Sequence, residues 1–393
     1  MVREESAMAR RPLVTTLVLA LASAATLTLS AGGGALRAQG ADPQPKVEHG
    51  FDVRVVAHVD EPREMFVTST GELIVATLTD AVYAIDDAEG NVKAPRVFTR
   101  VDDAPVAGVA RGGDSLFIGS EHGIWRLPFH DGDRRPEAAP KKIADVRSGG
   151  GRGHVTTSLA FASGRLYASV GSSCNACTET DPTRATVLEM KPDGSGLHPK
   201  AVHIRNAIAL GTSPVTNNVW AGVAGQDELE HGRPYEIFDP VTLHAGTGDY
   251  GWPTCYENHR AAQAGADCAR MTVSRVVFPA YETPIGVAIY PRNATAHAFP
   301  AFYRGGAFVA LHGSWHKPLV PPRVVFVALH GDDPAKAVDW NDPSAQWTAF
   351  LSGFQSADGS RIGRPTGVAV GPQGSLFVGD DLAGVIYRIT PSR

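Results

Sequence analysis

The stretch that decides the fold is GVAVGPQGSLFVG, residues 367–379. Two short apolar segments, Gly367–Val370 and Leu376–Gly379, flank a turn that contains Gly374. Apolar segments joined by a glycine turn predict a β-hairpin. A third alternating segment follows at Val385–Ile389. The unit therefore predicts three consecutive antiparallel strands.

The same unit occurs five more times upstream, each time as two apolar segments around a turn containing Gly or Asn. These copies are Met65–Val67 with Leu73–Ala76, Gly108–Ala110 with Leu116–Gly119, Ser158–Phe161 with Leu166–Val170, Ile208–Leu210 with Val219–Val223, and Gly286–Ile289 with Ala307–Leu311. Most are followed by another alternating segment, at Val82–Ile85, Ile124–Leu127, Val187–Met190 and Val324–Leu329. Radial repetition of small antiparallel sheets forms a β-propeller. Six copies predict an all-β, six-bladed propeller, with seven blades as the alternative if the long insertion Gly225–Tyr281 holds one.

The composition agrees with a large all-β protein. The chain has 393 residues, of which 43% are hydrophobic, and this is enough for a large core and excludes disordered and fibrous classes. Its 42 glycines and 28 prolines are typical of many short strands joined by turns. The net charge is −5 and no Lys/Arg-rich run occurs. We therefore expect no nucleic-acid partner, because the electrostatic footprint of such a protein is missing.

The first forty residues have the composition of an export signal. Arg10-Arg11 precedes the apolar stretch Pro12–Ser30, and small residues suited to signal peptidase follow at Ala31–Ala41. An uncleaved membrane anchor is the alternative, because the stretch is just long enough to span a bilayer. We expect a signal peptide over residues 1–40, a propeller over residues 41–393, and a periplasmic or secreted protein with no stable membrane insertion after cleavage.

The four cysteines form two local pairs. In an oxidising compartment, their positions suggest disulfides between Cys174 and Cys177 and between Cys255 and Cys268. The C-x-x-C pair could instead be redox-active or bind zinc, although the second pair has the wrong spacing for a zinc ribbon.

Several polar groups stand directly beside the predicted strands. His154 ends a glycine-rich segment before the third repeat, and imidazole is the side chain best suited to remove a hydroxyl proton near neutral pH. A surface histidine on a glycine loop is the alternative. Arg205-Asn206 opens the fourth repeat, and Arg364 enters the sixth. The cluster His312–Lys317 lies at the fifth. Such cations could converge on an acidic ligand or form a solvated rim.

The insertion supplies candidate metal ligands. Gln226-Asp227-Glu228 and Asp249–Pro253 offer oxygen atoms and an aromatic wall, a composition suited to Ca²⁺. The segments lack the regular spacing of an EF-hand loop. Composition alone therefore leaves the calcium site open.

A set of uncommon strings carries a family resemblance. They are His154–Val170, GSSCNACTE (171–179), DPTRA (181–185), KPDGSG (191–196), Arg205-Asn206, YGWP (250–253), HGSW (312–315) and GRPTGVA (363–369). In order and spacing they resemble the soluble quinoprotein sugar dehydrogenases, the glucose/sorbosone dehydrogenase family that uses pyrroloquinoline quinone (PQQ), and the sorbosone-type branch is the more similar. The family fold is a six-bladed propeller.

The resemblance implies roles for individual residues. His154 matches the family's general base, and Arg205 matches the arginine beside the reactive quinone carbonyl. Asn206 and Arg364 match cofactor contacts, as does Lys317 or, less securely, His316. In the family, a Ca²⁺ that bridges PQQ is held largely by backbone carbonyls, and these correspond to the region of Gly225 and Gln226. Asp227 and Tyr250 lie in a stretch that is associated with a nearby calcium in relatives.

The sequence departs from the family at four places, one of which is Glu230-His231, where a Gly-Asp segment is usual. Sorbosone-type relatives carry Asn-Glu-Arg-Asp where this chain has residues 224–227, and Asn-Arg where it has His316-Lys317. The glucose-oxidising branch has an acid at the position of Ser172. These changes concern metal geometry and substrate choice more than the reaction class.

The resemblance implies oxidation of an aldose or a sorbosone-like sugar aldehyde to a lactone or acid, with hydride passing to the quinone and His154 as base. Electrons would leave to a separate acceptor, a cytochrome or a quinone. Two alternatives are a Ca²⁺-dependent lactonase, which needs a ring of Glu, Asn and Asp ligands, and a non-catalytic propeller that binds sugars or proteins.

Overall fold

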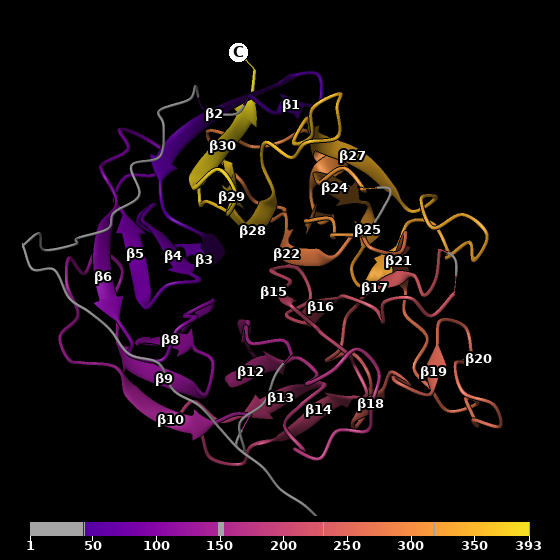
Figure 1. Ribbon diagram of the computed structural model, residues 1–393. Coiled ribbons are helices and arrows are strands. Elements are labelled where there is room, and N and C mark those ends of the chain that lie inside the picture. Colours follow the sequence, from indigo (N-terminus) through magenta and orange to yellow (C-terminus); the bar gives the residue numbers. More distant parts are fainter. Residues whose placement is uncertain (1–41, 43, 148–152, 231, 317–318, 393) are drawn as a thin grey trace, which may run out of the picture. The chain divides into compact units, whose positions relative to one another are not determined.

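The structure is a computed structural model that describes residues 42, 44–147, 153–230, 232–316 and 319–392. These residues form six mainly antiparallel sheets arranged in a ring (Figure 1), together with two short two-stranded sheets. The first strands surround a central channel, which holds a cavity. The predicted six-bladed propeller is confirmed for this part of the chain, and the seven-bladed alternative is wrong.

Blades 1 to 3 each take their four strands from one continuous segment. Blade 1 contains β3 (Pro62–Val67), β4 (Leu73–Thr77), β5 (Ala81–Ile85) and β6 (Arg96–Arg100); blade 2 contains β7 (Gly108–Gly112), β8 (Ser115–Gly119), β9 (Gly123–Pro128) and β10 (Lys141–Asp145); blade 3 contains β11 (Leu159–Ala162), β12 (Arg165–Val170), β13 (Thr186–Met190) and β14 (His198–Val202), with β18 (Gly248–Asp249) parallel at its edge.

Blades 4 to 6 carry longer connections. Blade 4 contains β15 (Ala209–Thr212), β16 (Val219–Val223), β17 (Glu236–Asp239) and β21 (Val276–Phe278); blade 5 contains β22 (Pro284–Ile289), β23 (Ala307–Leu311), β24 (Arg323–Val327), β27 (Trp347–Ser352) and β1 (Lys46–Val47); blade 6 contains β28 (Pro365–Val370), β29 (Leu376–Asp380), β30 (Val385–Pro391) and β2 (Phe51–His58). The remaining elements are β19 (Cys255–Tyr256), β20 (Arg260–Ala261), β25 (Leu329–His330), β26 (Asp333–Pro334) and the 3₁₀ turn η1 (Ala301–Tyr303). The first strands of neighbouring blades contact one another, so they line the channel.

The insertion Gly225–Tyr281 completes blade 4 and forms no further blade. It contains the third and fourth strands of that blade, β17 and β21, which pair in antiparallel register. Between them lie β18, at the edge of blade 3, and the small hairpin β19–β20.

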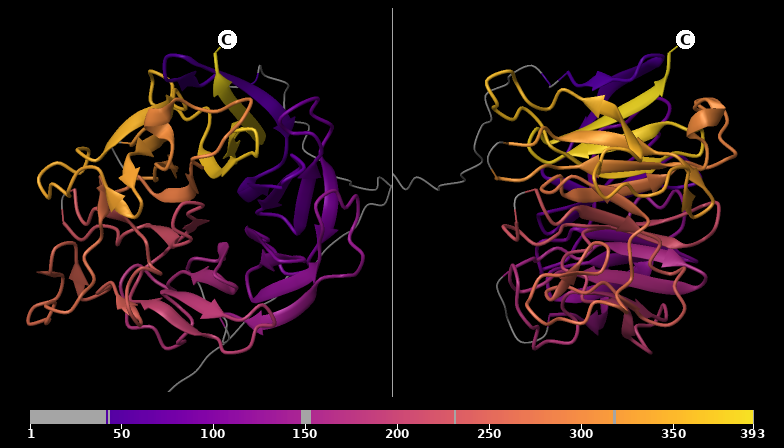
Figure 2. Two further views of the ribbon diagram at one scale, coloured as in Figure 1. Left: turned by 180° about the vertical axis from the view of Figure 1, so that it is seen from behind. Right: turned by 90° about the vertical axis from the view of Figure 1, so that its right-hand side faces the viewer.

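The last blade is closed by the N-terminal strand of the described region. β2 pairs with β30 in antiparallel register from Phe51 opposite Pro391 to His58 opposite Val385. This closure was not among the sequence predictions. Contacts group Asp42–Arg393 into one unit, and Figure 2 shows its sheets from behind and edge-on.

The hydrophobic core is divided into clusters that lie between neighbouring blades. One cluster joins Trp220, Phe238 and Phe278 of blade 4 to Val287 and Val309 of blade 5. Full burial of such side chains stabilises the fold by roughly 1.5–3 kcal/mol each. Because every blade packs against both neighbours, the loops at each end of the channel are held on a rigid support.

The predicted signal peptide, residues 1–40, lies outside the described residues. Within the part of the chain that the structure describes, no helix has the length and apolarity that crossing a membrane requires.

Candidate functional site

The predicted site residues come from one face of the ring of blades. In each blade the first two strands are antiparallel, so the start of the first strand and the end of the second lie at the same face. His154, Arg205 and Arg364 precede the first strands of blades 3, 4 and 6. We call this face, formed by the segments before the first strands and after the second strands, the site face.

His154 is held by the segment that follows the second strand of blade 3. Its Nδ1 lies 3.1 Å from the carbonyl oxygen of Ser172 and 3.2 Å from the Ser172 Oγ, and its backbone N–H donates to the same carbonyl at 3.1 Å. The neighbouring Gly153 has a φ of +107°, and a β-carbon there would lie 2.6 Å from the Ser172 carbonyl oxygen. Only glycine permits this close approach.

The surroundings of His154 favour its neutral form. Burial, followed by the positive charges of Arg205, Arg147 and Arg184, lowers the pKa of His154 to about 4. With Nδ1–H donating to the Ser172 carbonyl, the lone pair of the neutral ring lies on Nε2. No hydrogen bond to Nε2 occurs among the described residues. The imidazole is thus a free base at neutral pH, with its acceptor nitrogen open.

Gly171 brings His154 and Asn206 together. A β-carbon at this position would lie 2.5 Å from the Cβ of His154 and 2.5 Å from the Oδ1 of Asn206. The backbone adds to this link, because the Ser172 N–H donates to the Arg205 carbonyl at 2.8 Å. Blades 3 and 4 therefore carry the predicted base and the predicted cofactor residues at one place.

The guanidinium of Arg205 is buried and fully hydrogen-bonded. Nε donates to the Asn175 carbonyl (3.2 Å), Nη1 to the carbonyls of Ala224 (3.4 Å) and Gly225 (2.6 Å), and Nη2 to Asn175 Oδ1 (3.0 Å) and Asp227 Oδ2 (2.9 Å). These five bonds use all five N–H donors of the group. Burial lowers the pKa of Arg205, and Asp227 opposes that effect.

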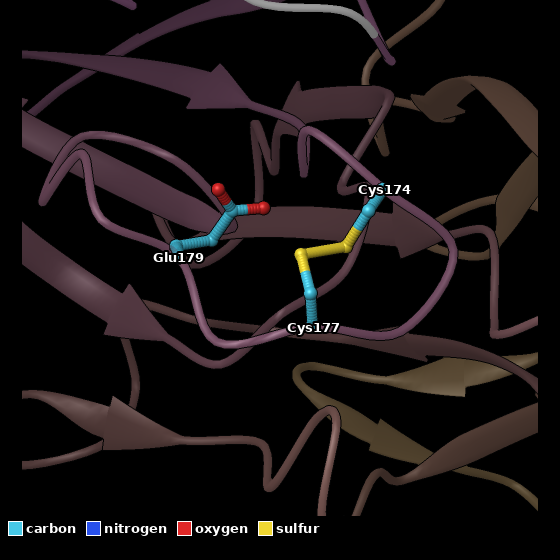
Figure 3. Close-up of side chains that lie close together, drawn as sticks. All are labelled: Cys174, Cys177 and Glu179. Atoms are coloured by element: carbon cyan, nitrogen blue, oxygen red, sulfur yellow. A yellow bond between two sulfur atoms is a disulfide. The ribbon is translucent and has the colours of Figure 1, made fainter.

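Both predicted disulfides are confirmed: Cys174 is bonded to Cys177 and Cys255 to Cys268. Glu179 lies beside the first pair (Figure 3). The sulfur atoms of Cys174 and Cys177 and a carboxylate oxygen of Glu179 lie within 4.8 Å of one another, close enough to be ligands of one metal ion. The thiolates that zinc requires are absent from this disulfide, so the zinc alternative is wrong.

The four residues assigned to calcium do not offer it a free set of ligands. The Gly225 carbonyl and one Asp227 oxygen contact Arg205, and the Tyr250 hydroxyl donates to Asp239 Oδ2 at 2.6 Å within the core of blade 4. Gln226 lies beside Arg205 and Tyr250 in a small cavity of about 60 Å³. A divalent cation at Gly225 would be repelled by the guanidinium, so this arrangement does not fit Ca²⁺.

Glu236 is a buried acid next to this segment that the sequence predictions did not include. Its carboxylate accepts the N–H groups of Gly225 (2.5 Å) and Tyr281 (2.9 Å). Burial raises the pKa of Glu236 to about 7, although these two bonds and Arg205 oppose it. Glu236 is the first residue of β17, a strand that the sequence analysis did not predict, so no sequence signal identified it.

Of the predicted pair at blade 5, His316 belongs to the site face and Lys317 lies outside the described residues. The His316 ring stacks on Tyr281 and Trp315, with centroids 3.9 Å apart in both pairs. Its Nδ1 is 2.7 Å from the Ser314 Oγ. Nε2 is buried without a hydrogen bond in the described structure and lies 3.7 Å from Asp227 Oδ1.

Arg364 belongs to a charged cluster on the side of blades 5 and 6. It donates to the carbonyls of His312 (3.2 Å) and Gly313 (2.8 Å). His312 Nε2 is 3.0 Å from both oxygens of Asp381, which also accepts a bond from Arg63 at 2.8 Å. Burial would raise the pKa of Asp381, but His312 and the arginines lower it overall.

Arg63 and Asp381 were missed from the sequence. Arg63 lies near the start of the first strand of blade 1, and Asp381 directly follows the second strand of blade 6. His154 and Arg364, by contrast, both precede first strands. A search of the starts of the first strands and the ends of the second strands in all six repeats would have found both missed residues.

A large cavity lies at the opposite end of the channel. It has a volume of about 720 Å³ and is lined by the later residues of the first strands, such as Phe66–Ser69, Ala110–Gly112 and Val368–Pro372. None of the predicted site residues lines it. The candidate site is therefore defined by the convergence of polar residues on the site face and not by cavity size.

Comparisons with known proteins agree with this architecture. A family model described as TrAA12-like matches residues 254–392. An uncharacterized protein of Borreliella burgdorferi is 25% identical over 193 residues, so the chain matches about half the length of this curated relative.

Two solved structures show the same fold at low identity. A structure of Trichoderma reesei Carbohydrate-Active Enzymes Family AA12 has a TM-score of 0.73 at 19% identity, covering 91% of this chain and 100% of that one. The holo form of the pyranose dehydrogenase PQQ domain from Coprinopsis cinerea has a TM-score of 0.75 at 18% identity, covering 88% and 97%. The predicted resemblance to the quinoprotein sugar dehydrogenases is confirmed, while the sorbosone-type branch stays a prediction.

Proposed function

We propose that this chain is a quinoprotein dehydrogenase that oxidises a sugar, an aldose or a sorbosone-like sugar aldehyde, to a lactone or acid with PQQ as cofactor. The observation that carries the proposal is the meeting of a neutral imidazole, His154, with Asn206 across Gly171, where the charge of the buried Arg205 also acts on the imidazole. The likeness to a PQQ domain from a pyranose dehydrogenase supports the same reaction class.

The charges on the site face fit an anionic cofactor. Arg147, Arg184 and Arg205 each lower the pKa of His154, so the base lies in a positive field. Arg364 and Arg63 add positive charge at blades 6 and 1. PQQ carries three carboxylates and an o-quinone, and when bound it supplies the two-electron acceptor that no side chain provides. The remaining cofactor assignments, Asn206, His316 and Lys317, are part of this proposal.

His154 acts as the general base in this proposal. The Ser172 carbonyl fixes its tautomer, so Nε2 can accept the proton of the sugar hydroxyl that is oxidised. Arg205 provides a fixed positive charge close to that base, which favours negative charge developing in the same place. Because its N–H groups are already bonded to protein oxygens, its orientation is set before any ligand binds.

Calcium was predicted as a second cofactor, but the predicted ligands are already engaged by Arg205 and Asp239. No chemical step of the proposal depends on the metal. A calcium titration, described in the Discussion, tests this directly.

The compartment and partners complete the proposal. Two disulfides are typical of the periplasm or of secreted proteins. Electrons would pass to a separate carrier, a cytochrome or a quinone.

Reconstitution of the cofactor-free chain tests the function. The protein is incubated with PQQ, with and without Ca²⁺, and dye reduction is followed with a panel of aldoses and sugar aldehydes. We expect sugar-dependent reduction that requires PQQ. Lactone hydrolysis without quinone would instead identify a lactonase, and sugar binding with neither activity would identify a non-catalytic propeller.

A further inference from the structure

Asn175 lies between Cys174 and Cys177 of the first disulfide. It makes several hydrogen bonds to the neighbouring blade, although the sequence analysis assigned it no role. Its carbonyl accepts bonds from Arg205 Nε (3.2 Å) and Trp252 Nε1 (3.0 Å). Its Oδ1 accepts bonds from Arg205 Nη2 (3.0 Å) and the Asp227 N–H (2.8 Å), and its Nδ2 donates to the Asp227 carbonyl (2.9 Å). One residue from blade 3 thus connects three residues of the blade 4 region.

Asn175 supplies two of the five acceptors around Arg205. The others are the carbonyls of Ala224 and Gly225 and the carboxylate of Asp227. Because Asn175 bonds both Nε and Nη2, it contacts one edge of the planar guanidinium bidentately and fixes its plane. It also holds the backbone of Asp227, the counter-ion of the same group.

The loop that carries Asn175 is itself fixed at several points. The disulfide closes a ring around Asn175 and Ala176. The Ser172 Oγ donates to the Cys174 carbonyl at 2.7 Å. The Glu179 carboxylate accepts the Ser173 N–H at 2.6 Å and its hydroxyl at 2.8 Å, beside the disulfide in Figure 3.

The same loop also holds the predicted base. Ser172 accepts the Nδ1–H of His154, and Asn175, three residues later, holds Arg205. The distance and orientation between base and cation are therefore determined by one short, cross-linked segment. A chain without the cross-link would have to order these residues at the moment of binding, at a cost in affinity.

We infer that Asn175 is a positioning residue, which the Cys174–Cys177 disulfide holds against Arg205 and Asp227 so that the guanidinium keeps one orientation relative to His154. The inference deepens the proposed function and rests on it. It assigns to the disulfide a role at the site in addition to stability. Asn175 is not itself assigned contact with the reacting atoms.

The test compares Asn175→Ala with Asn175→Asp, and uses Thr178→Ala as a matched control in the same exposed part of the loop, where no hydrogen bond of the side chain is found. In Asn175→Ala, the three side-chain bonds to Arg205 and Asp227 are lost. We expect the Kd for PQQ to rise and kcat to fall, each by roughly 10- to 100-fold, while the sugar KM stays unchanged. Asn175→Asp keeps an acceptor for Arg205 and should recover part of both losses.

A second measurement keeps the inference separate from the proposed function. The Arg205 Nη–H signals in ¹H–¹⁵N spectra of the cofactor-free chain need no PQQ, and the variant Arg205→Lys assigns them. Nη2 is the atom that donates to the Asn175 side chain. We expect slow solvent exchange in the wild type and in Thr178→Ala, and fast exchange in Asn175→Ala and in the double variant Cys174→Ser/Cys177→Ser.

The outcomes distinguish the two claims. Wild-type exchange of Arg205 in Asn175→Ala would overturn the positioning role, whatever the cofactor. An equal loss of PQQ affinity in Asn175→Ala and Thr178→Ala would also overturn it, because a general loop effect would explain both. Fast exchange in Asn175→Ala combined with failure of the wild type to bind PQQ would support the positioning role and reject the proposed function.

Discussion

The Nδ1 atom of His154 lies 3.1 Å from the carbonyl oxygen of Ser172, a backbone acceptor that cannot itself lose or gain a proton. This contact fixes the ring and its tautomer without adding a negative charge, so burial and the arginines are left to set the basicity. A carboxylate in the same place would raise the pKa of the imidazole. The arrangement therefore orients a weak base in a positive field.

Replacing His154 tests its role as base. We expect His154→Ala to lower kcat by roughly 10²- to 10⁴-fold, the contribution of a positioned base, with PQQ binding nearly unchanged. Steady-state dye reduction and a PQQ titration of the cofactor-free chain measure the two quantities. An unchanged turnover would reject the base assignment, and His198→Ala, an exposed histidine on β14, serves as the control.

The ionisation of His154 should depend on the cofactor. In the cofactor-free chain we expect the imidazole to titrate with a pKa of about 4, and PQQ carboxylates beside the arginines should raise that value. NMR titration of the histidine signals, assigned with His154→Gln, measures both states. A free-chain value near 6.5 would show that the ring is solvated and not surrounded by the arginines.

The same shift has a consequence for stability. Because the folded pKa of His154 is lower than its unfolded value of about 6.5, its contribution is fully present above pH 6.5 and is lost as pH falls through about 4. Urea unfolding of the wild type and His154→Gln at pH 7 and pH 4 should show this loss only in the wild type.

Gly171 should tolerate no side chain. A β-carbon there would lie 2.5 Å from atoms of both His154 and Asn206, so Gly171→Ala must displace one of them. We expect about 1–3 kcal/mol of lost stability, as in other overpacked interiors, with a larger proportional loss of activity than of folded protein. The control is Ala176→Ser, which adds one atom on the exposed loop nearby. Gly164→Ala is unsuitable as a control because the positive φ of Gly164 would itself strain an alanine. Normal activity in Gly171→Ala would contradict the close packing.

Arg205 should be needed for both cofactor retention and rate. Arg205→Ala removes the cation that pairs with Asp227 at 2.9 Å, and we expect kcat to fall by roughly 10²- to 10³-fold, as for loss of a preorganised electrostatic group. A double-mutant cycle with Asp227→Asn measures how much of the loss is due to the pair. A holoenzyme of normal activity in Arg205→Ala would reject the role.

Calcium should bind weakly to the cofactor-free chain. The predicted ligands are engaged by Arg205, so we expect calorimetric titration after chelation to detect no binding tighter than about 1 mM, the weak end for protein Ca²⁺ sites. Micromolar binding to the wild type that is lost in Asp227→Asn would restore the calcium site that the sequence predicted.

The sequence predicted most of the fold because its information is local. Most hairpins have their two apolar segments and their turn within about fifteen residues, as in residues 367–379. Their strands could be located because alternation and glycine occur together. β17 was not predicted because its four residues begin with Glu236 and end with Asp239, both buried. β2 was not predicted as the closing strand because its partner, β30, lies at the other end of the chain.

The candidate site was predictable only in part. His154, Arg205 and Arg364 were identified through family motifs and their places beside strands, and the fold brings the first two together. Asn175 could not be identified from its type or its spacing, because its importance comes from partners in another blade. The hydrogen bond from Arg205 to the Gly225 carbonyl could likewise not be predicted from the sequence. Because of this bond, the residues predicted to bind calcium do not fit the ion.

The pairing of β2 with β30 gives both ends of the propeller a share in one sheet. A tag or fusion joined to either end would emerge beside the other, and a circular permutant that joins them would need only a short linker. Conversely, any shortened version that begins after His58 would leave the sixth sheet with an uncovered edge, a surface that invites pairing with a second molecule.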